Sequence, residues 1–504
     1  MKRFFANLII ISSIILGTGD YSLPQLQTAD QSITGKEILK HVRYLASYEL
    51  KGRETFAEGQ YEAARYIAKE FEKYGMKTLI KTQDYYQYFE IECVKVIPPS
   101  TFEINGKSYT EREDFRVAAV GGGGIENEVV FIGYGISTEQ YDSYADVDVK
   151  NKIVMVFQGK IYRKGPVWGL APFHPMRVLY AINHEASGMI FVEGTAPKDH
   201  KWPIPSNWNL GLITLIEPIA QKMGLGSWND EVWEKWFNFP LVYVNVDVGN
   251  ELLKNSGRTI QELKDEIDRA GKPHSFAVEQ RAKIQTRISH GPKETMNVIG
   301  MIEGSDSSLK EEFIVVGAHY DHLGTSEDSG EVYYGADDNA SGTAALLEIA
   351  QAFAKSKTKT KRSIVFVAFT GEEVGALGSN HYINNPEVPL SKTVAMFNLD
   401  MVGRNNPDEI MVLCVGKNKD LLAGINNKAS TKVGIDLKEL ERSYADSSDH
   451  SCFYRKGIPV IFYYDGGGDF AHKPADTWDK LSPLKMEKVA RLCFLALSDL
   501  ANRD

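Results

Sequence analysis

From Asn297 to the C-terminus, apolar runs of strand length alternate with segments whose apolar residues recur at helical spacing. Strands that alternate with helices form a sheet that buries both of its faces against those helices. The sequence therefore predicts an α/β fold in this region, with a mixed twisted β-sheet flanked by helices on both faces. The predicted strands are 313–317, 364–369, 394–399, 410–415 and 459–463, and the predicted helices are 342–355, 419–430 and 484–500.

The pattern of apolar and turn-forming residues is different in the part of the chain before residue 297. Residues 34–75 carry apolar residues at helical spacing on both sides of a turn at 50–53, which predicts two helices. Between about 97 and 289, short β-type runs are separated by Gly, Pro and Asp, and nearly all tryptophans lie here. Because 504 residues exceed one ordinary core, we predict one domain from residues 20–96 and 290–504, into which a β-rich domain, 97–289, is inserted.

The N-terminus has the organisation of a secretory signal. Lys2 and Arg3 precede an apolar run at 4–17, and small residues follow it. This order is typical of a signal peptide, and the run is shorter than the ~20 residues of a membrane span. We therefore predict a signal peptide at 1–19, a secreted or periplasmic protein, and no stable membrane span after cleavage. A single N-terminal anchor helix is the alternative.

The net charge bears on nucleic-acid partners, and the spacing of the cysteines bears on disulfide bonds. With a net charge of −10 and a pI near 5.7, the chain lacks the basic character of nucleic-acid-binding domains, so no nucleic-acid partner is expected. The four cysteines are scattered and form no Cys-x-x-Cys pair. We predict buried free thiols, with a single Cys414–Cys452 bridge as the alternative.

Polar residues with the chemistry of metal ligands lie at the ends of predicted strands or in the adjoining loops. The carboxyl ends of parallel strands meet at one edge of a sheet, so side chains from separate elements would converge there. Several carboxylates together with histidines have the composition of a metal site with a base beside it. The candidate residues are His319, Asp321, Asp337, Glu372, Glu373, Asp400 and His472.

Each candidate has an ordinary structural explanation when it is considered alone. A histidine after a strand is more often a hydrogen-bonded core or surface residue than a ligand. The run at 335–342, Gly-Ala-Asp-Asp-Asn-Ala-Ser-Gly, suits a turn and a helix N-cap. The Glu-Glu pair suits an exposed face, and Asp400 suits a turn. Their occurrence together at strand ends is what favours the metal site.

Five short motifs in this region resemble those of metallopeptidase family twenty-eight, the dizinc aminopeptidases and their relatives. Residues 45–67 resemble the opening of bacterial members, and residues 129–153 resemble the protease-associated domain that many members carry as an insertion. The resemblance covers nearly all of the chain after the signal peptide, and it implies a zinc exopeptidase fold of the phosphorylase/hydrolase-like type. In the family's order from Ala318 to Thr477, the motifs are His-x-Asp, Gly-Ala-Asp-Asp-Asn-x-Ser-Gly, Gly-Glu-Glu-x-Gly, Asn-Leu-Asp-Met-Val-Gly and His-x-Pro-x-Asp-Thr.

The resemblance implies two zinc ions per chain and a role for each residue of the site. Two ions that share one water need a bridging carboxylate, because a neutral imidazole nitrogen offers one lone pair. Asp338 would fix the backbone of that bridge through a cis peptide. Asp321, two residues after His319, is placed to orient its imidazole, and a simple turn residue is an equal alternative. By this resemblance Asp337 would bridge the two ions and Glu372 would be the general base. Glu373 and His472 would complete the coordination of one ion, and His319 and Asp400 that of the other.

One position departs from the family's pattern. Many relatives place a tyrosine immediately before the last histidine, where its hydroxyl helps the tetrahedral oxyanion, and this chain has Ala471 there. Either Tyr463 or Tyr464 substitutes for it, or the zinc ions suffice. The oxyanion stabiliser and any carboxypeptidase-like specificity are left open by this departure.

The expected function is that of an exported zinc-dependent metallo-exopeptidase, an aminopeptidase that hydrolyses N-terminal residues from peptides. A dipeptidase or carboxypeptidase of the same fold is one alternative, and a non-catalytic binding ectodomain is another. Glutaminyl cyclases share the fold but lack the inserted domain, and so carry little weight. Peptides are the expected substrates, and the inserted domain is expected to shape access to the cleft and to offer a surface for protein contacts.

Overall fold

The structure is a computed structural model that describes residues 29–79, 84–117, 121–158, 174–193, 230–326 and 329–504. Its strands form two sheets of eight strands and one of two. The predicted signal peptide at 1–19 lies outside the described residues.

The first sheet is mixed and carries the candidate residues. Its four central strands run parallel, and antiparallel neighbours flank them on both sides. The order across the sheet is β1-β12-β14-β13-β15-β18-β16-β17. These strands are β1 (Tyr86–Val96), β12 (Ile288–Ile302), β13 (Phe313–His319), β14 (Ser363–Phe369), β15 (Thr393–Leu399), β16 (Glu409–Val415), β17 (Asp436–Glu439) and β18 (Val460–Tyr464).

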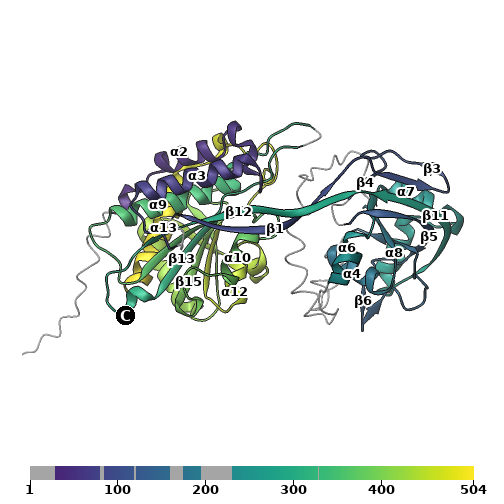
Figure 1. Cartoon of the computed structure of the whole chain (residues 1–504). Coiled ribbons are helices and arrows are strands. Elements are labelled where there is room, and N and C mark those ends of the chain that lie inside the picture. The colour runs from purple at the N-terminus through teal and green to yellow at the C-terminus, as the bar shows by residue number, and fades with distance from the viewer. Residues whose placement is uncertain (1–28, 80–83, 118–120, 159–173, 194–229, 327–328) are drawn as a thin grey trace, which may run out of the picture.

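Helices cover both faces of this sheet, which confirms the predicted α/β fold (Figure 1). Successive residues of a strand point to opposite faces, so Ile314 and Val316 enter one core while Val315 enters the other. The helices of the first face are α2 (Gly35–Leu45), α3 (Glu58–Lys73), α9 (Gly342–Lys355), α11 (Lys419–Val433) and α13 (Pro483–Asn502), and those of the second are α10 (Leu377–Asn384) and α12 (His450–Arg455).

The sequence pattern locates the long elements and misses the short ones. Helix α9 has the predicted bounds, 342–355, and the predicted strands match β13 to β16 and β18 within two residues. The pattern does not predict α10, α12 or β17. The two helices have eight and six residues, too few to show a clear helical period, and β17 is a largely exposed edge strand. All four cysteines are free thiols, as predicted.

The described residues between 101 and 286 build the second sheet together with several helices. Four neighbouring strands of this sheet run parallel, which requires crossover connections. The inserted segment therefore contains helices as well as strands, and the sequence pattern predicts two of these helices, at 174–185 and 259–270. The strands are β2 (Thr101–Ile104), β3 (Lys107–Ser108), β4 (Phe115–Val117), β5 (Gly123–Phe131), β8 (Ile153–Phe157), β9 (Gly188–Val192), β10 (Leu241–Val244) and β11 (Phe276–Thr286), with the pair β6 (Ser137–Thr138) and β7 (Tyr141–Asp142) apart; the helices are α4 (His174–Asn183), α6 (Asp230–Phe237), α7 (Val246–Leu253) and α8 (Ile260–Ala270).

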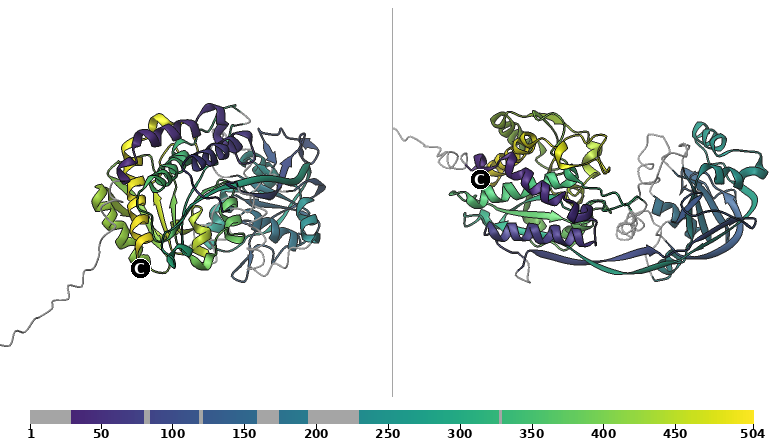
Figure 2. Two further views of the ribbon diagram at one scale, coloured as in Figure 1. Left: turned by 60° about the vertical axis from the view of Figure 1, so that its left-hand side comes forward. Right: turned by 90° about the horizontal axis from the view of Figure 1, so that it is seen from above.

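A long antiparallel ribbon of β1 and β12 joins the two sheets. Its register runs from Tyr86 opposite Val298 to Val96 opposite Ile288. The right-hand view of Figure 2 shows the ribbon passing from the first sheet to the second. The chain thus leaves and re-enters the first sheet through adjacent strands, and no candidate residue lies in the second sheet.

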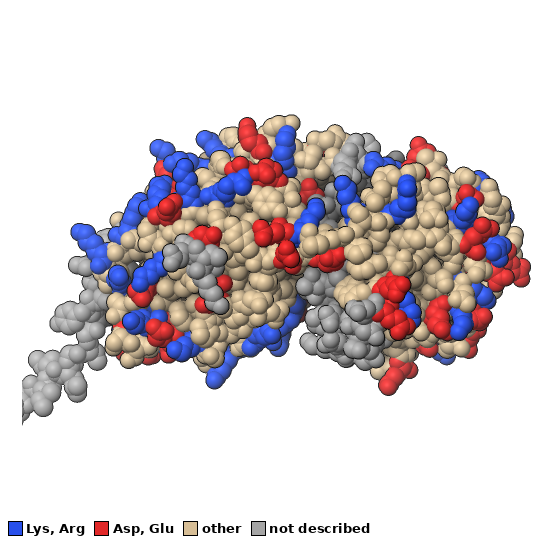
Figure 3. Space-filling model, in the orientation of Figure 1, with Lys and Arg blue, Asp and Glu red and all other residues tan. Residues whose placement is uncertain are grey.

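The surface mixes charges of both signs. On the face seen in Figure 3, Lys and Arg side chains are interspersed with Asp and Glu, and no continuous basic surface is visible there. Within the described ranges, every helix falls short of the length and apolar character needed to cross a membrane.

Glu193, which directly follows β9, is a buried acid in the second sheet. Arg116 of β4 donates to its carboxylate, with Nε 3.4 Å from Oε2. Burial outweighs this ion pair and raises the pKa of Glu193 to about 7. The folded protein therefore holds the proton more tightly than the unfolded chain does. The resulting stabilisation is fully present at low pH and is lost as the pH rises through about 7.

We predict that Glu193→Gln stabilises the protein at pH 8, because glutamine keeps an acceptor oxygen for Arg116 without carrying a charge. The difference in free energy of unfolding between variant and native chain should grow by roughly 2–3 kcal/mol from pH 5 to pH 8. Urea unfolding at the two pH values measures it. Glu185→Gln, at an exposed position, is the matched control. A pH dependence of Glu193→Gln equal to that of the native chain would contradict the prediction.

Candidate metal centre

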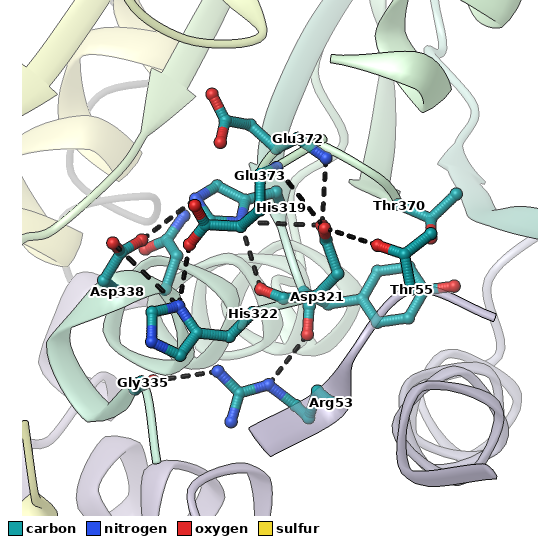
Figure 4. Close-up of polar contacts among 12 residues, drawn as sticks. Arg53, Thr55, His319, Asp321, His322, Gly335, Asp338, Thr370, Glu372 and Glu373 are labelled. Atoms are coloured by element: carbon teal, nitrogen blue, oxygen red, sulfur yellow. Dashed lines mark hydrogen bonds and ion pairs between the residues drawn. The ribbon is translucent and has the colours of Figure 1, made fainter. Parts of the chain in front are cut away.

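The candidate side chains come from the carboxyl ends of the parallel strands. His319 is the last residue of β13, Asp400 follows the last residue of β15, and Glu372 and Glu373 lie in the turn after β14. His472 lies in the loop after β18. Because these strands are parallel neighbours, their ends meet at one edge of the sheet and bring the side chains together (Figure 4).

Two groups of ligand-type atoms share the carboxylate of Asp338. Its Oδ1 lies 3.3 Å from His319 Nε2, and its Oδ2 lies 3.0 Å from His472 Nε2. Asp400 Oδ1 completes the first group at 3.4 Å from His319 Nε2, and Glu373 Oε2 completes the second at 3.1 Å from His472 Nε2. Each group offers one imidazole nitrogen and two carboxylate oxygens, a donor set that zinc prefers. One carboxylate common to both groups fits a pair of ions.

The structure places Asp337 outside both groups, which corrects the expectation that this residue bridges two ions. Its Oδ1 accepts from the backbone N–H of Gly403 at 2.8 Å, and its Oδ2 lies 3.6 Å from Nε of Arg404. The backbone leaves helical geometry at Asp338 (φ −106°, ψ 94°), so the two successive carboxylates point to different sides. Burial, and then the negative charge of Asp465, raises the pKa of Asp337 well above its usual range.

The turn that carries Asp338 is held by the side chain of Asn339. A cis peptide bond is present, and it joins Asp338 to Asn339. The Asn339 side chain donates to the carbonyl of Leu399 at 2.9 Å and accepts from the backbone N–H groups of Gly342 at 2.9 Å and Met401 at 3.1 Å. These bonds connect the turn to the start of α9 and to the end of β15, so the bridging carboxylate and Asp400 stay in fixed relation.

Glu372 lies beside the two groups. Its carboxylate and ligand atoms of His319 and Glu373 all lie within 4.8 Å of one another. Burial raises the pKa of Glu372 well above its usual range, and the negative charges of Glu373 and Asp400 add to this effect, while the positive charge of His319 opposes it. The carboxylate of Glu372 thus lies where a proton acceptor for a water molecule at the ligand groups would be needed.

Asp321 is fully buried and connects three segments. Its Oδ2 accepts from the hydroxyl of Thr55 at 2.9 Å, and its two oxygens accept from the backbone N–H groups of Glu372 at 3.1 Å and Glu373 at 3.4 Å. The Nδ1 of His319 lies 3.7 Å from its Oδ1 and 3.3 Å from its backbone carbonyl. Asp321 is thus more than a turn residue, since it holds the turn of Glu372 and Glu373 and the ring of His319 at fixed places.

Arg53 is a site residue that the sequence analysis treats only as part of a turn. Its buried guanidinium donates to backbone carbonyls of the two loops that carry ligands, at 2.8 Å to Tyr320, 2.9 Å to Tyr334 and 2.8 Å to Gly335, and also to the carbonyl of Leu45. Burial lowers the pKa of Arg53 to about 10, and nearby carboxylates oppose this shift. No local pattern signals this role, because its partners in the two ligand loops lie 267 to 282 residues away.

His322 is the second residue that the sequence analysis misses. Its Nδ1 lies 2.7 Å from Oε1 of Glu373, and ligand atoms of His322, Asp338 and Glu373 lie together. The sequence does carry a signal for His322. In the motif His-Tyr-Asp-His, it is a second histidine three residues after His319, the last residue of the strand.

The histidines and carboxylates of the second group shift one another's pKa. The negative charge of Glu373 raises the pKa of His472 to about 11, against the effect of burial. Burial and the charge of Asp338 favour a higher pKa for Glu373, but the charge of His472 and hydrogen bonds from His322 and His472 outweigh them and lower it to about 2. Positive ions would take the place of the imidazole protons, so metal binding should release protons.

Tyr463 and Tyr464 differ in their relation to the position of Ala471. The hydroxyl of Tyr463 donates to Asn426 of α11 at 2.7 Å, so this side chain points into the helical face of the sheet. Burial raises the pKa of Tyr464, and the negative charge of Asp400 adds to the effect. Of the two, Tyr464 is therefore the one whose pKa is shifted by a candidate ligand.

Asp449 and His450 are buried at the start of α12. Both carboxylate oxygens of Asp449 are buried without a hydrogen-bond partner among the described residues, and burial raises its pKa to about 7. His450 Nε2 lies 2.9 Å from the carbonyl of Tyr444, and burial lowers its pKa to about 4. Neither side chain belongs to a ligand group.

Sequence comparison relates this region to known proteins. Residues 297–497 match the model of a family described as peptidase family M28. Aminopeptidase YwaD of Bacillus subtilis is 28% identical over 238 residues, which are 45% of this chain and 50% of that protein. The match thus spans about half the length of this relative.

Two solved structures share the fold over nearly the whole chain. An aminopeptidase from Aneurinibacillus sp. strain AM-1 superposes with a TM-score of 0.65 at 22% identity and covers 95% of this chain and 97% of its own. The zinc aminopeptidase BSAP from Bacillus subtilis superposes with a TM-score of 0.58 at 19% identity and covers 94% and 96%. At these identities the likeness shows the fold alone.

We predict that Asp338→Asn weakens zinc binding and Asp337→Asn does not. Only Asp338 places an oxygen against each histidine, and an amide offers one weak acceptor where two anionic oxygens are needed. Zinc affinity should fall on the order of 100-fold or more in Asp338→Asn, since even residues behind the ligands are worth roughly 10–100-fold. Competition with a chelator measures it. Asp337→Asn is the matched control because it keeps an oxygen for Gly403, and the reverse order of the two variants would contradict the assignment.

Proposed function

We propose that this protein, whose residues 297–497 match the model of peptidase family M28, is a zinc-dependent metallo-exopeptidase, and more specifically an aminopeptidase that hydrolyses N-terminal residues from peptides. The observation that carries the proposal is the position of Asp338 between two histidine–carboxylate groups, with Glu372 beside them. The Bacillus subtilis relative, which is named an aminopeptidase, supports the same activity.

Two zinc ions would be held by this chain's own residues. His319, Asp400 and one oxygen of Asp338 would hold the first, and His472, Glu373 and the other oxygen of Asp338 would hold the second. When bound, zinc supplies Lewis acidity toward a water molecule and toward a carbonyl oxygen. The neighbouring residues keep the ligands in place and exclude bulk water, because most of the ligating side chains are buried.

Glu372 is the proposed general base. It accepts the proton of the attacking water and passes this proton to the leaving amine, a role worth roughly 10²–10⁴-fold in rate. Its position beside the ligand groups supports this role, because its carboxylate and ligand atoms of His319 and Glu373 lie within 4.8 Å of one another. The hydrogen bond from its backbone N–H to Asp321 fixes the turn from which it acts.

We predict that Glu372→Gln lowers the kcat for an aminoacyl anilide by roughly 10²–10⁴-fold, because an amide cannot accept the proton. The zinc content should stay at the native level, since Glu372 completes neither ligand group. Glu373→Gln is the neighbouring control and should lose zinc together with activity. Turnover by Glu372→Gln at the native rate would rule out this mechanism.

The end of the peptide that the enzyme reads distinguishes an aminopeptidase from other exopeptidases. We predict that peptides with a free N-terminus are shortened one residue at a time and that N-acetylated peptides are not cleaved. Amidation of the C-terminus should have no effect. Mass spectrometry of the products decides the matter. Cleavage of acetylated peptides would favour a carboxypeptidase. Cleavage of two-residue peptides alone would favour a dipeptidase, and a zinc-loaded but inactive protein would favour a binding ectodomain.

The location of the protein and the role of its inserted segment belong to the same proposal. The basic and apolar character of residues 1–19 supports export to the periplasm or the cell exterior. Residues 97–289 are proposed to be a protease-associated-type domain that shapes access to the site and contacts other proteins. Their separate core, which includes Trp236 and lies in its own sheet, supports a module distinct from the peptidase part.

A further inference from the structure

His322 is buried at the centre of the second ligand group without being needed to complete it. Its Nδ1 lies 2.7 Å from Glu373 Oε1 and 4.0 Å from Asp338 Oδ2. Its ring meets the ring of His472 edge-on, with centroids 6.0 Å apart. The other oxygen of Glu373, Oε2, is the one that lies 3.1 Å from His472 Nε2. The two oxygens of Glu373 are therefore divided between the two histidines.

The imidazole of His322 is fixed in position by its surroundings. Its backbone N–H donates to the carbonyl of Arg53 at 3.1 Å, and its ring packs directly on Gly335. A Cβ at Gly335 would lie 2.4 Å from Cγ of His322, and the residue has a φ of +57°, so the backbone comes as close as a glycine permits. The ring therefore cannot turn away from Glu373 without moving the loop that carries Asp338.

The far nitrogen of the ring decides which tautomer is favourable. Nε2 of His322 is buried and has no hydrogen-bond partner among the described residues. If Nδ1 gave its lone pair to a cation, the proton would have to sit on Nε2 as a buried donor without an acceptor. With the proton on Nδ1, the ring donates to an anionic carboxylate and only a lone pair is left unpaired. A charge-assisted bond is the stronger of the two arrangements.

We propose that His322 is a positioning residue that donates Nδ1–H to Oε1 of Glu373 and so presents Oε2 to the cation shared with His472 and Asp338. His322 is then not itself a ligand. This inference deepens the proposed function and rests on it for the identity of the cation. It assigns Glu373 one fixed rotamer before the cation arrives, because one of its oxygens is already engaged.

Three substitutions at position 322 separate positioning from ligation. Asparagine places an amide N–H near the position of Nδ1, whereas glutamine reaches toward the position of Nε2 and alanine offers no donor. The affinity for the zinc ion held by Glu373, His472 and Asp338, measured by chelator competition with the full chain, should fall roughly 10–100-fold in His322→Ala and His322→Gln. In His322→Asn it should stay within about threefold of the native value.

His290 provides a matched control, because its Nδ1 also lies 2.7 Å from a glutamate, Glu92, but on the exposed ribbon. His290→Ala should leave zinc binding unchanged. Far-UV circular dichroism confirms that each variant is folded, and His322→Asn and His322→Gln differ too little in size for a packing defect to separate them.

Two outcomes overturn the proposal. Loss of zinc in His322→Asn equal to that in His322→Ala would make His322 a ligand or a packing residue, and native affinity in His322→Ala would leave it without a role. Failure of the proposed function would be a separate result. A native protein that binds two zinc ions but cleaves no peptide would contradict the peptidase proposal, while the order of zinc affinities among the variants at position 322 would still test the role of His322.

Discussion

The carboxylate of Asp321 is the interaction on which the rest of the site depends. It accepts hydrogen bonds from Thr55 in the N-terminal segment and from the turn that carries Glu372 and Glu373, and it lies against His319. A carboxylate that is completely buried is stable only when its oxygens are hydrogen-bonded. Here the groups that satisfy it are the Thr55 hydroxyl and the backbone N–H groups of Glu372 and Glu373. One buried charge thus sets the relative positions of residues that are far apart in sequence.

A second buried charge, that of Arg53, holds the backbone of the loops that carry the candidate ligands. Its guanidinium binds only backbone carbonyls, those of Tyr320, Tyr334 and Gly335 among them, so it fixes the course of both ligand loops without competing for their side chains. A planar fork with several donors can do this, whereas a lysine ammonium has no such geometry. Its positive charge also lies near an excess of carboxylates, which makes their close approach less costly.

Within this frame, adjacent residues of similar chemistry take different roles. Asp337 points to Gly403 and Arg404, while Asp338 points to the two histidines. In the same way Glu373 joins a ligand group and Glu372 lies beside it. The direction of each side chain depends on one pair of backbone dihedral angles, and these depend on partners in other parts of the fold, such as the carbonyl of Leu399 that holds Asn339.

The sequence by itself determined the α/β architecture, the strand ends at which polar residues gather, and the ligand types. Hydrophobic periodicity and short motifs are local, so they can be read from neighbouring residues; the bounds of α9 and the places of His319, Asp400 and His472 follow from them. Only the tertiary structure decided that Asp338 rather than Asp337 faces both histidines, and that Arg53 and His322 belong to the site. These features depend on contacts between residues up to about 300 positions apart, and on the direction of a side chain in a turn.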